Sequence, residues 1–355
     1  MALVIPAHNE ELVIADTINS AMKSGQTERD IFVVADGCSD RTVEIAAGLV
    51  GERNVLAQPQ SGKAKAILHA IQHFDIAGRY EWMHIADADG VFDLRYFTEI
   101  GERLAKAGAN IVAATGHIQS LEGGWISRYR TYEYTIGLEI LRRIQAFFGV
   151  IPVMPGPTSI FRTRILRKLD FNAGSLAEDM DLTMQIHRLR LGRIAYFPKA
   201  KTFSQDPKDL GDYIKQISRW YRGNFQVIQR HRIGLRRQKI DAYVTYVMVE
   251  QWLLVAGLIF IPFWCWFSTN YRPLAYMFLM DALFFFIFTV GAAARNHRAN
   301  VVGAFPLFYI LRFLTLVIFV RSWFEIVVQH KFSTPQAGWS VAGRRYRIGT
   351  GTVSH

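Results

Sequence analysis

The sequence predicts an α/β domain with a parallel sheet over residues 1–239, an all-α transmembrane domain over residues 240–330 and a basic tail over residues 331–355. Two observations lead to this prediction. Up to about residue 239, short apolar runs alternate with charged, amphipathic segments, which is the pattern of successive β-α units. From there to about residue 328 the chain is dominated by Phe, Leu, Ile, Val and Trp.

The first part contains five expected strands and four expected helices. Strands are expected at residues 2–5, 31–35, 55–57, 82–86 and 111–115, and helices at residues 10–22, 40–49, 63–74 and 96–107. In an open α/β sheet, ligands bind at the carboxyl ends of the strands. The polar loops at residues 7–10, 36–40 and 87–89 should therefore meet at one edge of the sheet.

Two aromatic and basic segments interrupt this rhythm, at residues 125–150 and 211–235. Each segment is predicted to form a long helix. It either lies on a membrane surface or packs half buried against the sheet. Membrane placement is favoured for the second segment, because the apolar third of the chain follows it directly.

Three apolar runs, at residues 240–267, 274–294 and 301–328, are each long enough to cross a bilayer of roughly 30 Å. The positive-inside rule places the basic loop at 295–298 and the basic tail on the cytosolic side. Three crossings would put the tail outside. Either the last run is re-entrant or interfacial, or the rule fails here.

Four charged residues lie inside these runs, where lipid contact is costly. They either line a passage for a polar acceptor or form ion pairs between helices. The four are Glu250, Asp281, Arg312 and Arg321.

The amino-acid composition favours some classes of binding partner over others. Lys and Arg exceed Asp and Glu by 41 to 30, and the basic residues crowd before the first apolar run, which favours membrane lipids. Without any zinc-finger, helix-turn-helix or RNP-like pattern, we expect no nucleic-acid partner. The two cysteines fit a reducing compartment, and residues 1–6 lack a secretory signal, so we expect a cytosolic first domain.

Asp87 and Asp89 follow an apolar strand and precede a glycine. Side chains at i and i+2 on an extended backbone point the same way, and paired carboxylates suit Mg²⁺ or Mn²⁺ together with substrate phosphates. The alternative is a simple turn with local hydrogen bonds.

Other strand and helix ends carry candidate ligand-binding residues. The loop with Ala7 and Glu10 favours an anion or a base edge, or merely caps a helix. Asp36 either accepts hydrogen bonds from a nucleobase or ribose or serves its own turn, and Lys63 either contacts a nucleotide or is solvated.

Later motifs follow in the second half of the domain. The small-residue turn Gly156, Pro157, Thr158 and Ser159 suits close approach to a ligand. Glu178, Asp179 and Asp181 lie at a helix start, where one carboxylate is a candidate general base or where they merely complement the helix dipole. Gln216, Arg219 and Trp220 lie on adjacent helical turns, suited to a diphosphate and a sugar ring.

In this order and spacing, the motifs Pro-x-x-Asn-Glu, Asp-Gly-x-Ser-Asp, Asp-x-Asp, Glu-Asp and Gln-x-x-Arg-Trp resemble the membrane-integrated family 2 glycosyltransferases. That group includes the poly-N-acetylglucosamine, hyaluronan, chitin and cellulose synthases and ceramide glucosyltransferase. The resemblance covers residues 2 to about 235. It implies a GT-A fold, a UDP-sugar donor and inversion at the anomeric carbon.

The resemblance also implies a role for each matching residue. Asp179 would be the catalytic base, with a pKa raised by Glu178, and Asp89 would ligate the metal near Asp87. The nucleotide sugar would be held by Ala7, Glu10, Asp36, Lys63, Asp87, Gln216 and Arg219. The acceptor would be bordered by Gly156, Pro157, Thr158, Ser159, Glu178 and Trp220.

Two departures from the family pattern are Ala35, where an Asp is frequent, and Ala177, where a Thr is frequent. The implied product is a β-linked polysaccharide on a saccharide acceptor, made by an integral protein of the cell (inner) membrane. Polymerising members generally use more helices than three, so we expect a homo-oligomer or a secretion partner, or transfer of a single sugar to a glycolipid. The alternative to an enzyme is a non-catalytic membrane scaffold with the same GT-A fold.

Overall fold

The computed structural model describes residues 1–121, 123–171, 174–234 and 237–331. Its strands form one eight-stranded sheet in the order β3-β2-β1-β4-β7-β6-β8-β5. The strands are β1 (Ala2–Ala7), β2 (Ile31–Asp36), β3 (Val55–Gln58), β4 (Trp82–Ile85), β5 (Val91–Phe92), β6 (Ile111–Ser120), β7 (Ser159–Arg162) and β8 (Arg193–Ser204).

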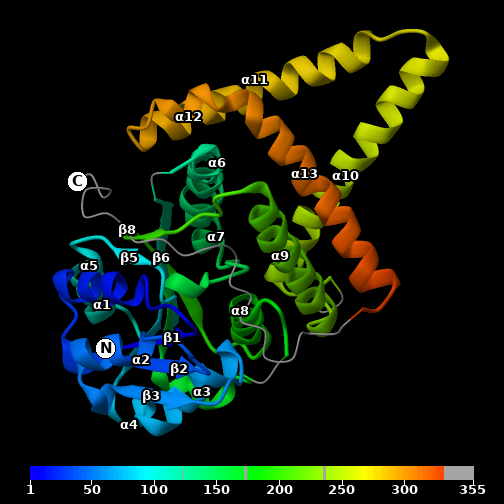
Figure 1. The fold of residues 1–355 in the computed structure, drawn as a ribbon. Coiled ribbons are helices and arrows are strands. Elements are labelled where there is room, and N and C mark those ends of the chain that lie inside the picture. Colours follow the sequence, from blue (N-terminus) through cyan, green and yellow to red (C-terminus); the bar gives the residue numbers. More distant parts are fainter. Residues whose placement is uncertain (122, 172–173, 235–236, 332–355) are drawn as a thin grey trace.

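The sheet is covered by helices on both faces (Figure 1). One face packs on α1 (Ile14–Lys23), α2 (Thr42–Val50) and α5 (Tyr96–Ala105). The other packs on α3 (Lys63–His73), the short α4 (Ile76–Arg79) and α8 (Glu178–Arg188). Alternate residues of β1 face opposite layers: Val4 packs in one and Leu3 and Ile5 in the other, as the two-residue repeat of a strand requires. Burial on both faces explains why these strands read as continuous apolar runs.

The sheet is mixed, so the expectation of a purely parallel sheet was wrong. Strands β1 to β4 are parallel, but β7 lies between β4 and β6 and is antiparallel to both, and β5 is antiparallel to β8. A parallel neighbour needs a crossover connection that returns the chain to the same end of the sheet. β7 instead enters from the far end, after the helical segment that follows β6. The α/β class and the five expected strands are confirmed.

Helix starts differ by a few residues from the expectation. The first helix begins at Ile14 rather than at residue 10, because Asn9 has a φ of 54° and residues 10–13 form a hydrogen-bonded turn. The second begins at Thr42, whose backbone N–H donates to Asp40. Both shifts lengthen the loops at the carboxyl edge of the sheet.

The two aromatic and basic segments are helical. The first consists of α6 (Trp125–Glu133), a π-helical stretch (Tyr134–Ile140) and α7 (Leu141–Phe148); the second is α9 (Leu210–Arg230). α6 and α9 pack against each other and against the apolar helices that follow. α7 leaves Phe147 and Phe148 exposed. Placement of either segment on a membrane surface stays a prediction.

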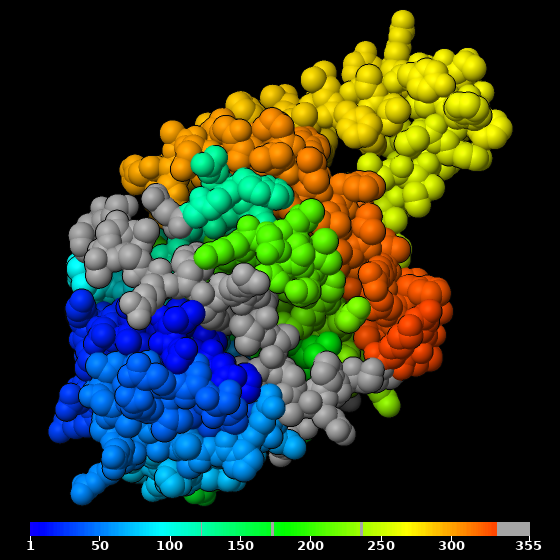
Figure 2. Space-filling model, viewed as in Figure 1, coloured from blue at the N-terminus to red at the C-terminus, as the bar shows by residue number. Residues whose placement is uncertain are grey.

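Three described helices are long and apolar enough to cross a membrane: α10 (Lys239–Ser268), α11 (Arg272–Arg295), and α13 (Phe305–Trp323) continued by a π-helical stretch to Val328. The short α12 (Asn300–Gly303) joins the last two. The end of α10 and the start of α11 project from the body as a hairpin (Figures 1 and 2), exposing large side chains such as Trp266 and Phe267.

The third apolar helix runs beside α9. Tyr213 of α9 bonds Thr315 at 2.9 Å, and Arg222 pairs with Glu325 at 2.7 Å, so the two helices touch along several turns. Of the charged residues in the apolar runs, Asp281 and Arg312 form an ion pair at 2.8 Å between α11 and α13. Arg344, Arg345 and Arg347 of the basic tail lie outside the described residues.

The contact between α8 and α9 depends on Gly223. A Cβ at this position would lie 2.7 Å from the Ala177 Cβ and 2.8 Å from the Ala177 backbone nitrogen. Gly223→Ala should therefore lower the thermal midpoint in detergent, at a cost of about 1–3 kcal/mol, although alanine favours a helix.

Gly48→Ala is the matched control, because a Cβ on this exposed glycine of α2 meets nothing within 4 Å. It should stabilise the protein by up to about 1 kcal/mol. Equal midpoint changes for the two variants would contradict the close contact.

Candidate active site

Three strand-end loops meet at the carboxyl edge of the sheet, as expected from the sequence. His8 bonds the backbone oxygen of Asp36 at 2.6 Å, and the backbone N–H of Glu10 donates to the Thr42 hydroxyl at 2.8 Å. These contacts join the loop after β1 to the loop after β2. Ala7 is fully buried and Glu10 is 4% exposed.

Asp36 organises the loop that leads into α3. Its carboxylate accepts from the backbone N–H groups of Ser61 and Gly62, both at 2.8 Å, and from the Gln58 side chain at 2.8 Å. The Asp36 carboxylate thus holds the loop before α3 and not its own turn, which was the alternative that the sequence left open. A contact from Asp36 to a nucleotide stays a prediction.

Lys63, the first residue of α3, bridges two carboxylates from distant parts of the chain. Its ammonium lies 2.6 Å from Asp87 after β4 and 3.0 Å from Glu178 at the start of α8. Burial opposes the charge on Lys63, but the two carboxylates raise its pKa above the ordinary value. Lys63 is therefore a fixed cation at the sheet edge and not a solvated side chain.

Gly156 leaves room for this bridge. A Cβ at this position would lie 2.9 Å from the Lys63 ammonium and 3.1 Å from an Asp87 oxygen. The backbone at this turn therefore passes close to the Lys63–Asp87 pair, and its close approach to a ligand stays a prediction. The next hydroxyls face the protein: Thr158 bonds Thr115 at 2.9 Å, and Ser159 donates to the Met154 backbone oxygen at 2.8 Å. Acceptor contacts of residues 156–159 stay predictions.

Asp179 lies next to this bridge on the first turn of α8. Burial, followed by the neighbouring Glu178 carboxylate, raises the pKa of Asp179 to about 6. Burial also opposes the charge on Glu178, but Lys63 and Arg219 lower its pKa below the ordinary value. The two adjacent acids therefore differ: Glu178 is held ionised, and Asp179 titrates close to neutrality.

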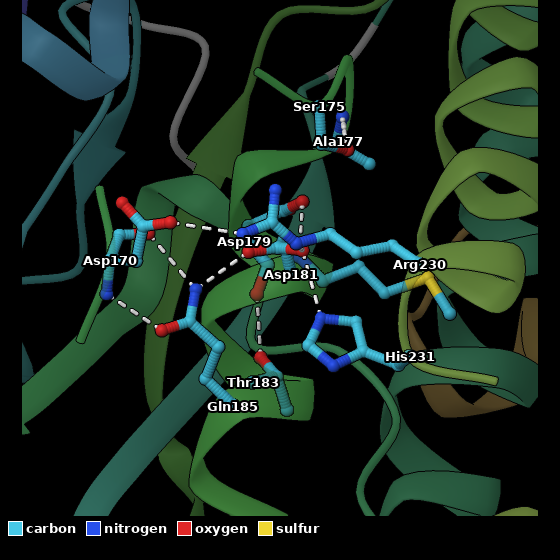
Figure 3. A network of polar contacts seen from close by, with 10 residues as sticks. Asp170, Ser175, Ala177, Asp179, Asp181, Thr183, Gln185, Arg230 and His231 are labelled. Atoms are coloured by element: carbon cyan, nitrogen blue, oxygen red, sulfur yellow. Dashed lines mark hydrogen bonds and ion pairs between the residues drawn. The ribbon is translucent and has the colours of Figure 1, made fainter. Parts of the chain in front are cut away.

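The third acid of this helix, Asp181, has a structural position (Figure 3). It is 1% exposed and accepts from the Gln185 amide at 2.6 Å, while a ring nitrogen of His231 lies 2.9 Å away. His231 ends α9. The Asp181 carboxylate therefore ties the helix that carries Asp179 to α9 and is not open to a substrate.

The three residues of the Gln-x-x-Arg-Trp motif on α9 have different neighbours: Arg219 contacts the segment that leads into α8, and the other two contact Arg130. Arg219 faces α8 and donates to the Leu176 backbone oxygen at 3.4 Å. Gln216 accepts from Arg130 at 2.6 Å, and the Trp220 ring lies 4.8 Å from the Arg130 guanidinium. The sequence did not single out Arg130, because it is one of several arginines in an aromatic and basic helix.

Asp206 is a second residue that the sequence analysis missed. It is 6% exposed and accepts a hydrogen bond from the Ser120 hydroxyl. Burial raises the pKa of Asp206 to about 7, against the lowering effect of Arg130. A lone Asp before a proline carries no sequence signal, and only the fold brings it beside Arg130.

The expected metal ligands, Asp87 and Asp89, lie directly after β4. Asp89 is 6% exposed, and Asp87 forms the ion pair with Lys63. Within residues 1–121, 123–171, 174–234 and 237–331, no group of three or more His, Cys, Asp or Glu side chains is placed to hold a metal ion. The loop after β4 offers two carboxylates, those of Asp87 and Asp89.

Residues 1–223 match the family described as "Glycosyltransferase like family 2", and the chain belongs to this family. Its mixed sheet has the fold of a GT-A-like domain.

The chain is homologous to poly-beta-1,6-N-acetyl-D-glucosamine synthases. The Staphylococcus epidermidis protein is 24% identical over 329 residues, which cover 85% of this chain and 77% of the relative. The Staphylococcus aureus protein is 24% identical over 259 residues, covering 71% and 60%. The solved mannosyltransferase PcManGT from Pyrobaculum calidifontis, in complex with GDP-Man and Mn²⁺, shares the fold, with a TM-score of 0.56, 14% identity, and coverage of 86% and 85%.

Arg130 contacts both Gln216 and Trp220 and should keep their side chains in position. Its side chain is 2% exposed and pairs with Glu133 at 2.7 Å. Arg130→Met should destabilise the protein by about 3 kcal/mol, because it leaves the Glu133 charge without its buried partner. The measurement is the thermal midpoint in detergent.

Lys215→Met is the control for this variant. Lys215 lies on α9 and pairs with Asp212, but its side chain is 74% exposed. Its removal should change stability by less than about 1 kcal/mol. A similar midpoint for both variants would argue against the central position of Arg130.

Proposed function

We propose that this protein is a metal-dependent, inverting glycosyltransferase that moves a sugar from a UDP-sugar to a growing β-linked polysaccharide. The observation that carries the proposal is the pair of unlike acids at the start of α8, of which Asp179 has a pKa of about 6. A general base works best when its pKa lies near the working pH. The homologous poly-beta-1,6-N-acetyl-D-glucosamine synthases support the class of product.

Asp179 takes the proton from the acceptor hydroxyl as that oxygen attacks the anomeric carbon. The bond from this carbon to the diphosphate breaks, and the diphosphate leaves with the bonding electrons. Arg219, which lowers the pKa of both Glu178 and Asp179, would stabilise the developing negative charge. Lys63 keeps Glu178 ionised and holds both Glu178 and Asp87 beside the reacting groups.

The acidic pair after β4 fits a divalent metal with few protein ligands. Asp89 would hold Mg²⁺ or Mn²⁺ close to Asp87, and waters and donor phosphates would complete the coordination. The metal would supply charge neutralisation at the diphosphate. Ala7, Glu10, Asp36 and Gln216 would complete the nucleotide-sugar site, and Trp220 with residues 156–159 the acceptor side.

We further propose that α10 and α11 cross the cell membrane and that the transferase domain faces the cytosol. Apolar exposure of this hairpin supports membrane insertion. A saccharide chain is the proposed acceptor, and a homo-oligomer or a secretion partner would provide the path for a long product.

Release of UDP tests the transfer reaction. Detergent-purified protein should release UDP from one UDP-sugar of a panel that begins with UDP-N-acetylglucosamine and includes UDP-glucose; GDP-mannose is included as a donor that would release GDP instead. Release should need Mg²⁺ or Mn²⁺ and should stop with EDTA. Product of high molecular mass supports polymer synthesis, whereas a single species extracted by organic solvent would identify a glycolipid product instead.

Asp179→Asn is the control for this assay and should lower turnover at least about a hundredfold while donor binding persists. Undiminished turnover would remove the base assignment. No release from any donor, with acceptors supplied, would overturn the enzyme proposal.

The pH dependence follows from the raised pKa of Asp179. The ionised carboxylate is the active form, so kcat/KM should be level above pH 7 and fall about tenfold per unit well below pH 6. The residual activity of Asp179→Asn should lack this decline. A decline shared by both proteins would assign it to another group.

A further inference from the structure

A polar cavity of about 240 Å³ lies between the transferase domain and the end of α11. One wall is formed by β6, β8 and the helical segment around Thr131, and the other by residues 295–298. The residues assigned to the transfer reaction do not line it. At this volume the cavity is smaller than the roughly 300–1,000 Å³ of typical small-molecule sites, which suits a compact group.

Cations dominate the lining. Lys201 on β8 is half buried, and within the described part of the chain no hydrogen bond or ion pair is found for its ammonium. Arg298 donates to the Ser120 backbone oxygen at 3.0 Å, which fixes its side chain at the cavity wall. Arg295 also lines the cavity and pairs with Glu139. Among the described residues that line the cavity, Asp93 is the acid.

The wall from α11 is fixed in place. Asn296 donates to the Thr135 hydroxyl at 2.7 Å and accepts from the Gln119 amide at 3.2 Å. These contacts hold the end of an apolar helix against a strand of the transferase domain. The cavity is therefore a preformed part of the junction between the two domains.

The position of the cavity at the end of α11 indicates which class of ligand it binds. α11 is long and apolar enough to cross a membrane, and the cavity begins at its last residue, Arg295. Lipid headgroups lie at this level, and basic pockets at helix ends on the cytoplasmic side bind anionic headgroups. We propose that this cavity binds the phosphate-bearing headgroup of an anionic membrane lipid through Lys201 and Arg298.

Thermal unfolding in detergent micelles tests the proposal without measuring transfer. The probe is phosphatidylglycerol, compared with phosphatidylcholine and with inorganic phosphate. Phosphatidylglycerol should raise the midpoint of the wild-type protein in a saturable way, and the other two should not. A shift of the same size with phosphatidylcholine, or one reproduced by inorganic phosphate, would overturn the lipid assignment.

Lys201→Gln should weaken the apparent affinity for phosphatidylglycerol about tenfold or more, because it removes one charge-assisted contact. Lys201→Arg keeps the charge and should keep most of the affinity. Lys199→Gln removes the same charge from an exposed position on the same strand, outside the cavity, and should behave as the wild type. Equal loss in Lys199→Gln and Lys201→Gln would show binding to surface charge only and would overturn the site.

Should Lys201→Gln unfold at a lower midpoint without lipid, Arg298→Lys provides a second test. It keeps a cation but removes the guanidinium that holds the cavity wall, and it should weaken the lipid response several-fold. An unchanged lipid response in both Arg298→Lys and Lys201→Gln would overturn the proposal.

Discussion

The ammonium of Lys63 is the contact on which the site depends. Asp87 follows a strand and Glu178 starts a helix 91 positions further along the chain, yet both carboxylates lie within 3.0 Å of the same nitrogen. Without that cation, two half-buried like charges would repel each other and draw water into the sheet edge. Because the bridge keeps Glu178 ionised, Glu178 in turn raises the pKa of Asp179. Burial remains the larger cause of the raised pKa of Asp179, and Lys63 itself acts to lower that pKa.

Helix α8 is held from several sides, which fixes the direction of its first turn. Asp181 ties it to the end of α9 through His231, and Arg188 forms a bidentate pair with Asp241 at 2.6 and 2.9 Å. Asp241 belongs to the first turn of α10. The helix that carries the proposed base is therefore joined directly to the start of the apolar domain, and a tilt of α10 would reach the site through one ion pair.

The apolar helices divide into two kinds by their contacts. α10 and α11 expose most of their large side chains, whereas α13 packs beside α9, where Phe319 of α13 lies in a buried cluster with Phe225 of α9. A helix so engaged with the transferase domain presents less of its surface to lipid. This difference bears on the conflict between three crossings and a basic tail, because it separates α13 from the two helices of the hairpin.

The sequence by itself determined the class of fold, the edge at which the site lies and the order of its motifs. Local patterns specify these features: alternating apolar runs give β-α units, and polar residues after parallel strands must share an edge. It also predicted the direction of the Asp179 shift, although burial contributes more than Glu178. Only the tertiary structure decided that β7 runs antiparallel, that Lys63 is bridged, and that Arg130 and Asp206 stand beside the motif on α9. These features depend on contacts between residues distant in sequence, which no local pattern encodes.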